Sequence, residues 1–327
     1  MASSKKTKKT IKIIKEEPAY HYAFIVNPAS AAGRTGQRWP AIEKEIQNHN
    51  LLSRVFFTKM KGEASDISRR QVQKGIPYIV AVGGDGTISE VAAGFFDSKG
   101  RPLKNSHQCA LGIINTGSGC DFAKSLRLPL DFHENIKILK KGFSQKVDMG
   151  IVSFINFEGK KTLRPFINIA DAGVGGEVVQ LLENQGKRWG TLAYLVATLR
   201  TLLNYHNKTM EITLDEAHTL SGRFLGAIIA NGRYFGSGMK IAPEADPADG
   251  YFDVVLLGDI SRLRALVYGP TLRWGKHTRL KDVRVFHAKK VQVNCQEECL
   301  LDVDGELPGY CPAEFEIVPE AIRIVIP

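Results

Sequence analysis

The stretch VAVGGDGTIS, residues 80–89, decides the fold class, because an apolar run changes abruptly to glycines around a single carboxylate. The run at 80–82 is typical of the end of a buried strand. Gly83, Gly84 and Gly86 supply no side chain to a core, so they favour a loop whose backbone closely approaches another group. The stretch therefore predicts a strand, a glycine loop and the start of a helix.

Similar strand–loop–helix units flank this stretch. YAFIVNP at 22–28 precedes a helical pattern at 37–50, and CALGIINTGSG at 109–119 precedes another at 120–126. Alternating strands and helices predict a parallel sheet with helices on both faces. The sequence therefore predicts an N-terminal α/β domain over residues 20–143.

The second half of the chain has a different pattern. Short apolar strands joined by turns, such as TMEITLD at 209–215 and YFDVVLL at 251–257, predict a β-rich antiparallel domain over residues 144–327. Its C-terminal strand is a candidate to return to the first domain. One helix is predicted at 189–205. Its broad apolar surface is typical of a core helix, and the alternative is a lid that rests on a lipid interface.

Composition indicates a soluble globular chain. Its 327 residues are 43% hydrophobic and 24% charged, and they suffice for two domains. No apolar run approaches 18 residues, so no transmembrane helix is predicted. The five cysteines have an odd count and no framework spacing, which favours a reducing compartment and a cytoplasmic location. Cys295 and Cys299 are a candidate metal pair, but the lack of a nearby histidine pair favours a hairpin tip.

The net charge of +10 favours anionic partners such as phosphate ligands or an acidic membrane surface. Residues 1–19 form a basic tail, with six Lys against two Glu in the first seventeen positions. Such a tail is typical of a disordered arm, and the alternative is a weak electrostatic attraction to anionic lipid. Aromatic residues are not interleaved with the basic ones, so we expect no nucleic-acid partner.

Three loops of small residues, at 27–34, 83–87 and 116–119, follow predicted strands of the parallel sheet. Ligands of such sheets bind beyond the carboxyl ends of the strands, where glycines let backbone N–H groups approach phosphate. Arg34 is available to pair with phosphate, and Asp85 fits if Mg²⁺ or water lies between it and the phosphate. The alternative is a tight turn with Asp85 as a helix cap. The sequence contains neither a P-loop nor a GxGxxG fingerprint.

These motifs, taken in order, resemble the diacylglycerol kinase catalytic domain family, which includes diacylglycerol, sphingosine and ceramide kinases. The resemblance runs from residue 25 to about 319. Its motifs are NPASAAGRTGQRWP, GGDGT, LGIINTGSGCDFAKSL, VDMG, NIADAGVGGEV, ANGRYFGSGMKIAPEADPADGYFDVVL and DGE. NAD kinases share the GGDG core, but their second nucleotide motif is missing here.

The resemblance implies a nucleotide-binding domain with a parallel, Rossmann- or phosphofructokinase-like sheet, then a β-sandwich domain, with the active site in the cleft between them. It implies an ATP- and Mg²⁺-dependent lipid kinase that phosphorylates a hydroxyl of a diacylglycerol- or sphingoid-type lipid. We expect such an enzyme to meet its lipid at a membrane surface as a peripheral protein, and a homodimer is left as an option. The alternatives are a non-catalytic lipid- or nucleotide-binding homologue and, less favoured, a NAD kinase.

The resemblance also implies roles for individual residues. Those implied for ATP are Asn27, Ser30, Gly33, Arg34, Gly84, Asp85, Gly86, Thr87, Thr116, Gly117 and Ser118. Those implied for Mg²⁺ are Asp85, Asp121 and Asp148 at a catalytic ion, and Asp246, Asp249 and Tyr251 at a structural one. Asp304 matches the general base and Glu306 lies beside it.

Two of these groups of residues also have an ordinary structural explanation, without a metal or catalytic role. The segment ADPADG at 245–250 is rich in oxygen ligands, but it also reads as an ordinary Asp-Gly turn. LLDVDGEL at 300–307 would place Asp302, Asp304 and Glu306 on one face of a straight strand, and the alternative is a polar hairpin turn.

Three positions depart from the family pattern. The family usually has Pro at the position of Asn115 and Asn at the positions of Cys120 and Ser89. Cys120 directly precedes Asp121. With a thiol in place of the usual Asn, the predicted metal network lacks that amide side chain.

Overall fold

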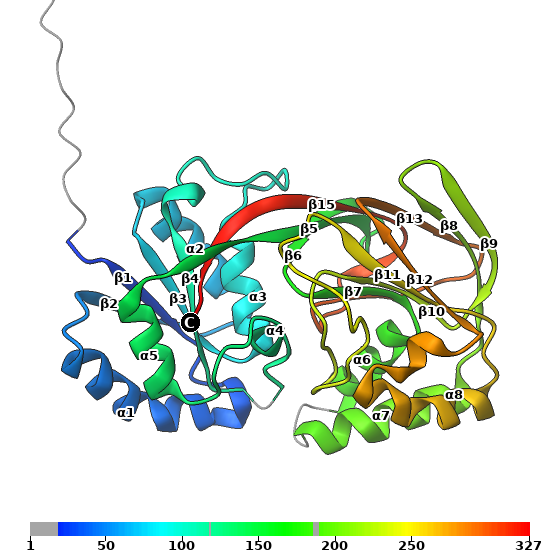
Figure 1. The fold of residues 1–327 in the computed structure, drawn as a ribbon, viewed down its shortest axis with the longest axis horizontal. Coiled ribbons are helices and arrows are strands. Elements are labelled where there is room, and N and C mark those ends of the chain that lie inside the picture. The colour runs from blue at the N-terminus through cyan, green and yellow to red at the C-terminus, as the bar shows by residue number, and fades with distance from the viewer. Residues whose placement is uncertain (1–18, 118, 186–189) are drawn as a thin grey trace, which may run out of the picture.

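The structure is a computed structural model that describes residues 19–117, 119–185 and 190–327. Most of the basic tail, Ser118 and the segment 186–189 lie outside the described residues. Two lobes lie side by side, and a pair of long strands crosses from one to the other (Figure 1).

The first lobe is built on a parallel sheet. Its strands are β1 (Tyr22–Val26), β2 (Ser53–Phe57), β3 (Tyr78–Gly83) and β4 (Ala110–Asn115), in the order β2-β1-β3-β4. Its helices are α1 (Arg34–Asn48), α2 (Glu63–Lys74), α3 (Asp85–Ala93), α4 (Asp121–Ser125) and α5 (Phe132–Lys141). The predicted parallel sheet and glycine loop are confirmed.

Both faces of this sheet are covered, which explains the nearly continuous apolar strands. Phe24 of β1 packs in one core with Ile42 of α1 and Ile136 of α5. The next residue, Ile25, packs on the opposite face with Ile67 of α2 and other side chains from α2 and α3. Successive side chains of a strand point to opposite faces, so a strand with helices on both sides is apolar throughout.

Two long strands join the lobes. β5 (Ser144–Asn156) and β15 (Gly309–Val325) pair antiparallel along most of their length. The end of β15 also pairs parallel to β4 in the first lobe, and its earlier part pairs with β13 (Lys290–Cys295) in the second. The final strand therefore lies in one continuous sheet with both lobes, as the red and green ribbons show (Figure 1).

The second lobe is a sandwich of two antiparallel sheets. The first sheet continues through β13, β8 (Lys208–Leu214) and β9 (His218–Phe224), with β6 (Lys161–Phe166) added beside β5. The second sheet has the order β12 (Val283–Ala288), β11 (Phe252–Leu257), β10 (Gly226–Ala230), β7 (Ile169–Gly173) and β14 (Leu301–Val303). Stacked and edge-on rings of Phe166, Phe252 and Phe315 fill the space between the sheets.

The second lobe contains more helix than the sequence predicted. α7 (Gly190–Asn204) matches the predicted helix, but α6 (Val174–Gln185) and α8 (Arg262–Tyr268) were missed. α6 begins with Val174-Gly175-Gly176, residues that favour a loop rather than a helix start. At this start the Asp171 carboxyl group of β7 accepts a hydrogen bond from the Gly175 N–H at 3.2 Å, which gives a partner to one of the first N–H groups of the helix. Among the described helices, none is long and apolar enough to cross a membrane.

Phe315→Ala tests the central position of β15 in this core. The Phe315 side chain is fully buried, so the variant should lose about 3–5 kcal/mol of unfolding free energy. Urea denaturation of the full chain measures the change. Phe143→Ala, which removes a ring that is 66% exposed, is the matched control and should change stability little. Equal losses in the two variants would contradict this account of the core.

Candidate active site

Hydrogen bonds join the three small-residue loops at the carboxyl ends of β1, β3 and β4. The Asn27 amide donates to the Thr87 hydroxyl at 3.2 Å, which links the first loop to the start of α3. The hydroxyls of Thr35 and Thr116 lie 2.6 Å apart, which links α1 to the loop after β4. Ser30 donates to the Asn27 carbonyl at 2.9 Å. The predicted ATP residues Asn27, Ser30, Thr87 and Thr116 therefore hydrogen-bond within and between these loops and do not line the cavity described below.

Glycines are needed where two of these loops touch. A Cβ at Gly117 would lie only 2.7 Å from the Gly84 Cα, so any side chain would push the loops apart. At Gly86 a Cβ would meet no described atom within 4 Å, so this glycine leaves open space at the start of α3. A helix N-terminus with an open approach is suited to a phosphate group. Arg34 is exposed, and its guanidinium donates to the Ala31 carbonyl at 3.0 Å.

Two carboxylates converge beside these loops. A Cβ at Gly119 would lie 2.8 Å from Oδ2 of Asp85 and 3.7 Å from Oδ2 of Asp121. Desolvation, with a smaller contribution from the charge of Asp121, raises the pKa of Asp85 to about 6. Desolvation also raises the pKa of Asp121, although Lys124 lies 3.5 Å from its carboxylate and opposes the rise. Two neighbouring carboxylates with raised pKa values form a site that a divalent cation would stabilise.

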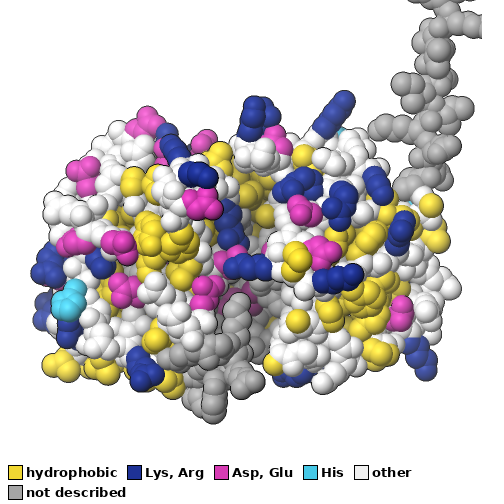
Figure 2. Space-filling view, turned by 180° about the vertical axis from the view of Figure 1, so that it is seen from behind, with side chains coloured by type: hydrophobic (Ala, Val, Ile, Leu, Met, Phe, Trp, Pro, Cys, Tyr) yellow, Lys and Arg dark blue, Asp and Glu magenta, His cyan; other side chains and the backbone are white. Residues whose placement is uncertain are grey.

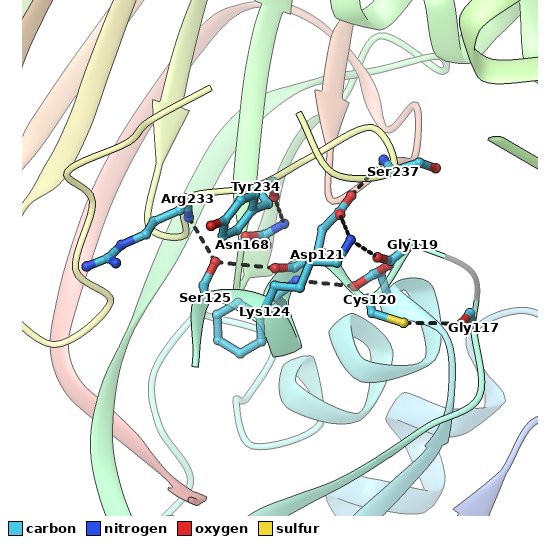
Figure 3. Close-up of polar contacts among 12 residues, drawn as sticks. Gly117, Gly119, Cys120, Asp121, Lys124, Ser125, Asn168, Arg233, Tyr234 and Ser237 are labelled. Carbon is cyan, nitrogen blue, oxygen red and sulfur yellow. Dashed lines mark hydrogen bonds and ion pairs between the residues drawn. The ribbon is translucent and has the colours of Figure 1, made fainter. Parts of the chain in front are cut away.

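A loop from the second lobe holds α4 in place (Figure 3). The Ser237 N–H donates to Oδ2 of Asp121 at 2.8 Å, and the Arg233 N–H donates to the Ser125 hydroxyl at 2.9 Å. Lys124 turns back to donate to the Gly119 carbonyl at 2.6 Å. The position of Asp121 is therefore set by both lobes.

Asp304 lies in the turn that follows β14, and four donors surround its carboxylate. Its Oδ2 accepts from the Ser89 hydroxyl at 2.6 Å and from the Ile167 N–H at 2.9 Å. Its Oδ1 accepts from the N–H groups of Asn168 at 3.0 Å and Ile169 at 3.1 Å. Ser89 belongs to α3, so this carboxylate joins the two lobes. Desolvation raises the pKa of Asp304, and the hydrogen bonds partly oppose that rise.

The segment with Asp302, Asp304 and Glu306 is not a straight strand but a hairpin turn, which was the alternative, so the three side chains do not share one face. β14 ends at Val303, and Asp304 has a φ of 53°, so the backbone turns and the three carboxylates enter separate environments. Asp302 is 6% exposed and accepts from the Gly305 N–H at 2.7 Å. Burial, reinforced by the charge of Asp171, raises the pKa of Asp302 to about 8.

Glu306 is held by two cations, one from each lobe. Its Oε2 lies 2.7 Å from the Arg164 guanidinium of β6 and 3.3 Å from the Lys61 ammonium. Burial alone would raise the pKa of Glu306, but Arg164 and Lys61 hold that pKa below its usual value. Neither cation was anticipated from the sequence, because nothing in its local pattern marks an ion pair between distant segments.

A cavity of about 380 Å³ lies between the lobes. The predicted site residues that line it are Gly84, Asp85, Gly86, Gly117, Asp121, Asp304 and Glu306. The lining also includes Asp302, residues 235–237 and apolar side chains from both lobes, namely Phe122, Ile167, Ile169, Val179 and Leu182. From behind, acidic and basic side chains gather at the furrow between the lobes (Figure 2). Ser118, also predicted for this site, lies outside the described residues.

Asp148 does not line this cavity with Asp85 and Asp121. It lies beside the turn at 246–251, where its carboxylate accepts from the N–H groups of Gly250 at 2.7 Å and Glu320 at 2.6 Å. Burial raises the pKa of Asp148, and the charges of Asp249 and Asp246 add to the rise. The six residues predicted to bind metal therefore fall into two groups, with Asp148 in the group of the turn.

A second cavity, of about 660 Å³, lies between the second sheet of the sandwich and the helices below it. Most of its wall is apolar, with contributions from Val178, Leu202, Ile228, Met239, Leu257 and Leu266. It shares Phe235, Gly236 and Ser237 with the carboxylate-lined cavity. The sequence did not predict this cavity, because α6 and α8, which form part of its wall, were not predicted.

Comparison with known sequences agrees with this architecture. The sequence model of the diacylglycerol kinase catalytic domain matches residues 21–152, and that of the YegS C-terminal NAD kinase beta sandwich-like domain matches residues 168–326. The chain belongs to the diacylglycerol kinase catalytic domain family.

Relatives of this diacylglycerol kinase family member cover nearly its whole length. A diacylglycerol kinase of Staphylococcus carnosus is 28% identical over 306 residues, which are 93% of this chain and 94% of that protein. One of Staphylococcus epidermidis is 27% identical over 309 residues, 93% of this chain and 91% of that protein. The crystal structure of a diacylglycerol kinase from Bacillus anthracis has a TM-score of 0.68 at 18% identity and covers 95% of this chain and 98% of that one.

Cys120, one of the three departures from the family pattern, has a left-handed backbone with φ 60° and ψ 32°. Asn adopts this conformation more readily than most residues, which accounts for its usual presence there. Here the Cys120 thiol lies 3.2 Å from the Gly117 carbonyl and hydrogen-bonds to it, so it still joins the two ends of the loop.

The raised pKa of Asp302 predicts a pH-dependent stability. The folded state keeps a proton on Asp302 up to about pH 8, whereas the unfolded chain releases it near pH 4. The free energy of unfolding therefore falls as the pH rises from about 4 to about 8. Asp302→Asn should remove the contribution of Asp302 to this pH dependence. The difference in unfolding free energy between the variant and the parent should therefore grow between pH 5 and pH 8, by up to about 1.4 kcal/mol per pH unit. Urea denaturation at both pH values measures this difference, and a difference independent of pH would refute the prediction.

Proposed function

We propose that this chain is a lipid kinase that transfers the γ-phosphate of ATP to a hydroxyl group of a diacylglycerol- or sphingoid-type lipid. The observation that carries the proposal is the junction of two unlike cavities. One is lined by glycine loops and carboxylates together with some apolar side chains, the other mostly by apolar side chains, and they share residues 235–237. A substrate with a polar hydroxyl end and long hydrocarbon chains fits such a pair of cavities.

The glycine loops support the nucleotide part of the proposal. The N-terminus of α3 offers backbone N–H groups to the phosphates of ATP. Asp85 and Asp121 would hold a catalytic Mg²⁺, because their neighbouring carboxylates repel each other without a cation. When bound, Mg²⁺ would neutralise charge on the phosphates during transfer. The turn at 246–251, with Asp148 beside it, fits a second, structural cation.

Asp304 is the proposed general base. A carboxylate has about four lone-pair positions, and its four donors here are three backbone N–H groups and the Ser89 hydroxyl. The backbone donors hold the carboxylate toward the cavity. The Ser89 hydroxyl is the donor that a substrate hydroxyl can replace, since it comes from the other lobe and has the same chemistry. Glu306, paired with two cations, is better suited to orient the site than to accept a proton.

The surface around the apolar cavity supports a lipid partner at a membrane. Exposed apolar side chains gather on the helices that cover this cavity: Val196, Leu199 and Leu203 on α7, and Leu263 and Val267 on α8. The net charge of +10 would favour contact with an anionic membrane surface. We therefore propose a peripheral protein of the cytoplasm that takes its lipid from the membrane through this end of the second lobe.

The proposal is tested by incubating the full chain with radiolabelled ATP and Mg²⁺ and a panel of lipids in mixed micelles: diacylglycerol, sphingosine and ceramide. Label should enter the organic phase with at least one of them, and chelation of Mg²⁺ should stop the transfer. ATP binding without label transfer to any lipid would contradict the proposal and favour a non-catalytic homologue. Label transfer to NAD instead would favour a NAD kinase.

Asp304→Ala and Asp304→Asn test the proposed base. Neither side chain can take the proton of the substrate hydroxyl, so turnover at saturating lipid should fall by about 10²–10⁴-fold while ATP affinity stays nearly unchanged. Calorimetry measures the affinity, and thermal unfolding shows whether the turn is still folded. Asp131→Asn, which keeps a capping oxygen at the start of α5, is the control and should retain activity. Turnover within a few-fold of the parent in a folded Asp304 variant would make Glu306 the next candidate.

Leu266→Trp tests the apolar cavity. Leu266 lines the cavity from α8, so the larger ring should occupy space needed by a lipid chain and reduce kcat/KM for long-chain lipid on the order of tenfold. The KM for ATP should stay constant, and a short-chain lipid should be affected less. Leu52→Trp is the control, because Leu52 is 56% exposed in the first lobe and lines neither cavity. Equal losses in both variants, or equal losses with short and long chains, would exclude this cavity as the lipid site.

A further inference from the structure

Three cysteines that are distant in sequence meet in the second lobe. Cys295 ends β13, Cys299 lies in the segment before β14, and Cys311 lies in β15. Their sulfur atoms all lie within 4.8 Å of one another. Among the described residues that line the two cavities, none is one of these three cysteines. The proposed kinase function therefore does not use them.

Backbone pairing fixes this arrangement. The Cys311 N–H donates to the Cys299 carbonyl at 2.9 Å, and Cys295 is paired with Met210 at the end of the β13–β8 ladder. Glu297, between Cys295 and Cys299, accepts hydrogen bonds from the backbone N–H and the hydroxyl of Thr209, at 2.9 and 3.2 Å. The strand pairing therefore brings the backbones of the three cysteines together, and their side chains point the sulfurs toward one another.

The spacing suits three sulfurs around one ion. With metal–sulfur bonds of about 2.3 Å, neighbouring ligand sulfurs lie roughly 4 Å apart. Thiolates select soft ions such as Zn²⁺ and Cu⁺, in contrast to the oxygen ligands of the two carboxylate groups. A disulfide would use two of the three cysteines and leave the third, whereas an ion uses all of them. Within the described residues, no His, Asp or Glu joins the cluster as a further ligand.

We propose that Cys295, Cys299 and Cys311 bind one soft metal ion, Zn²⁺ or Cu⁺, through three thiolates. Each ligand thiol releases its proton to solvent as its sulfur–metal bond forms. Cu⁺ is satisfied by three sulfurs, whereas Zn²⁺ takes water as its fourth ligand. Cys295 and Cys311 are partly exposed and give the ion a way in, while Cys299 is buried.

The ion would stabilise the segment that leads to the proposed base. It would join β13, β15 and the chain just before β14, and the turn with Asp304 directly follows β14. Because the unfolded chain does not hold the three sulfurs together, binding should favour the folded state.

The test uses the full chain, reduced and stripped of metal, and titrated without oxygen with Zn²⁺ in one arm and Cu⁺ in the other. Each titration is followed by metal analysis after gel filtration, by the number of thiols that react with a thiol reagent, and by thermal unfolding. We expect one ion per chain, protection of those cluster thiols that react in the metal-free chain, and an unfolding midpoint raised by several degrees. Competition with a chelator of known affinity for each metal shows which one is held more tightly.

Cysteine variants show whether metal uptake depends on these three cysteines or on other thiols of the chain. Cys295→Ser and Cys311→Ala change partly exposed positions, so the fold should persist while the affinity falls at least roughly tenfold. Cys109→Ala removes a buried thiol of the first lobe and should leave uptake unchanged. The proposal is overturned if neither metal binds in a one-to-one ratio, or if Cys295→Ser and Cys311→Ala bind like the parent. It is also overturned if mild oxidation forms a disulfide among the three while the reduced chain takes up no metal.

Discussion

The antiparallel pair of β5 and β15 is the constraint on which the rest of the structure depends. These strands share one hydrogen-bonded ladder, and the end of β15 continues into the parallel sheet through β4. A shift of this pairing by one residue would turn each buried side chain of β15 toward the opposite face. The position of each lobe therefore follows from the same register, and with it the width of the cavity between them.

Polar contacts across that cavity are specific, and apolar packing accompanies them, since Ile167 of the second lobe belongs to the same core cluster as Phe122 of the first. Asp304 bonds to Ser89, Glu306 pairs with Lys61, and Ser237 donates to Asp121, so each contact joins one lobe to the other. All three involve a carboxylate that the proposed reaction would use. The hydrogen bond from Ser89 therefore both positions the proposed base and joins the two lobes. A bound substrate hydroxyl would have to replace this hydrogen bond.

Carboxylates in this protein differ in protonation because they differ in neighbours. Glu306 stays ionised beside two cations, while Asp302, only two residues before Asp304, is buried facing Asp171 across the β7–β14 pair and tends to keep a proton. The turn after β14 creates this contrast within five residues. A separate set of carboxylates, around the turn at 246–251, lies outside the cavity.

The sequence by itself determined the parallel sheet, the glycine loops and the family, because these depend on local patterns: apolar runs that end in small residues and recur in order. It could not determine which distant groups meet. The left-handed turn at Asp304, the pairing of Asp148 with the 246–251 turn, and the approach of Cys311 to Cys295 all depend on strand register and on residues far away in the chain. Those contacts carry no periodic signal, so only the tertiary structure decided them.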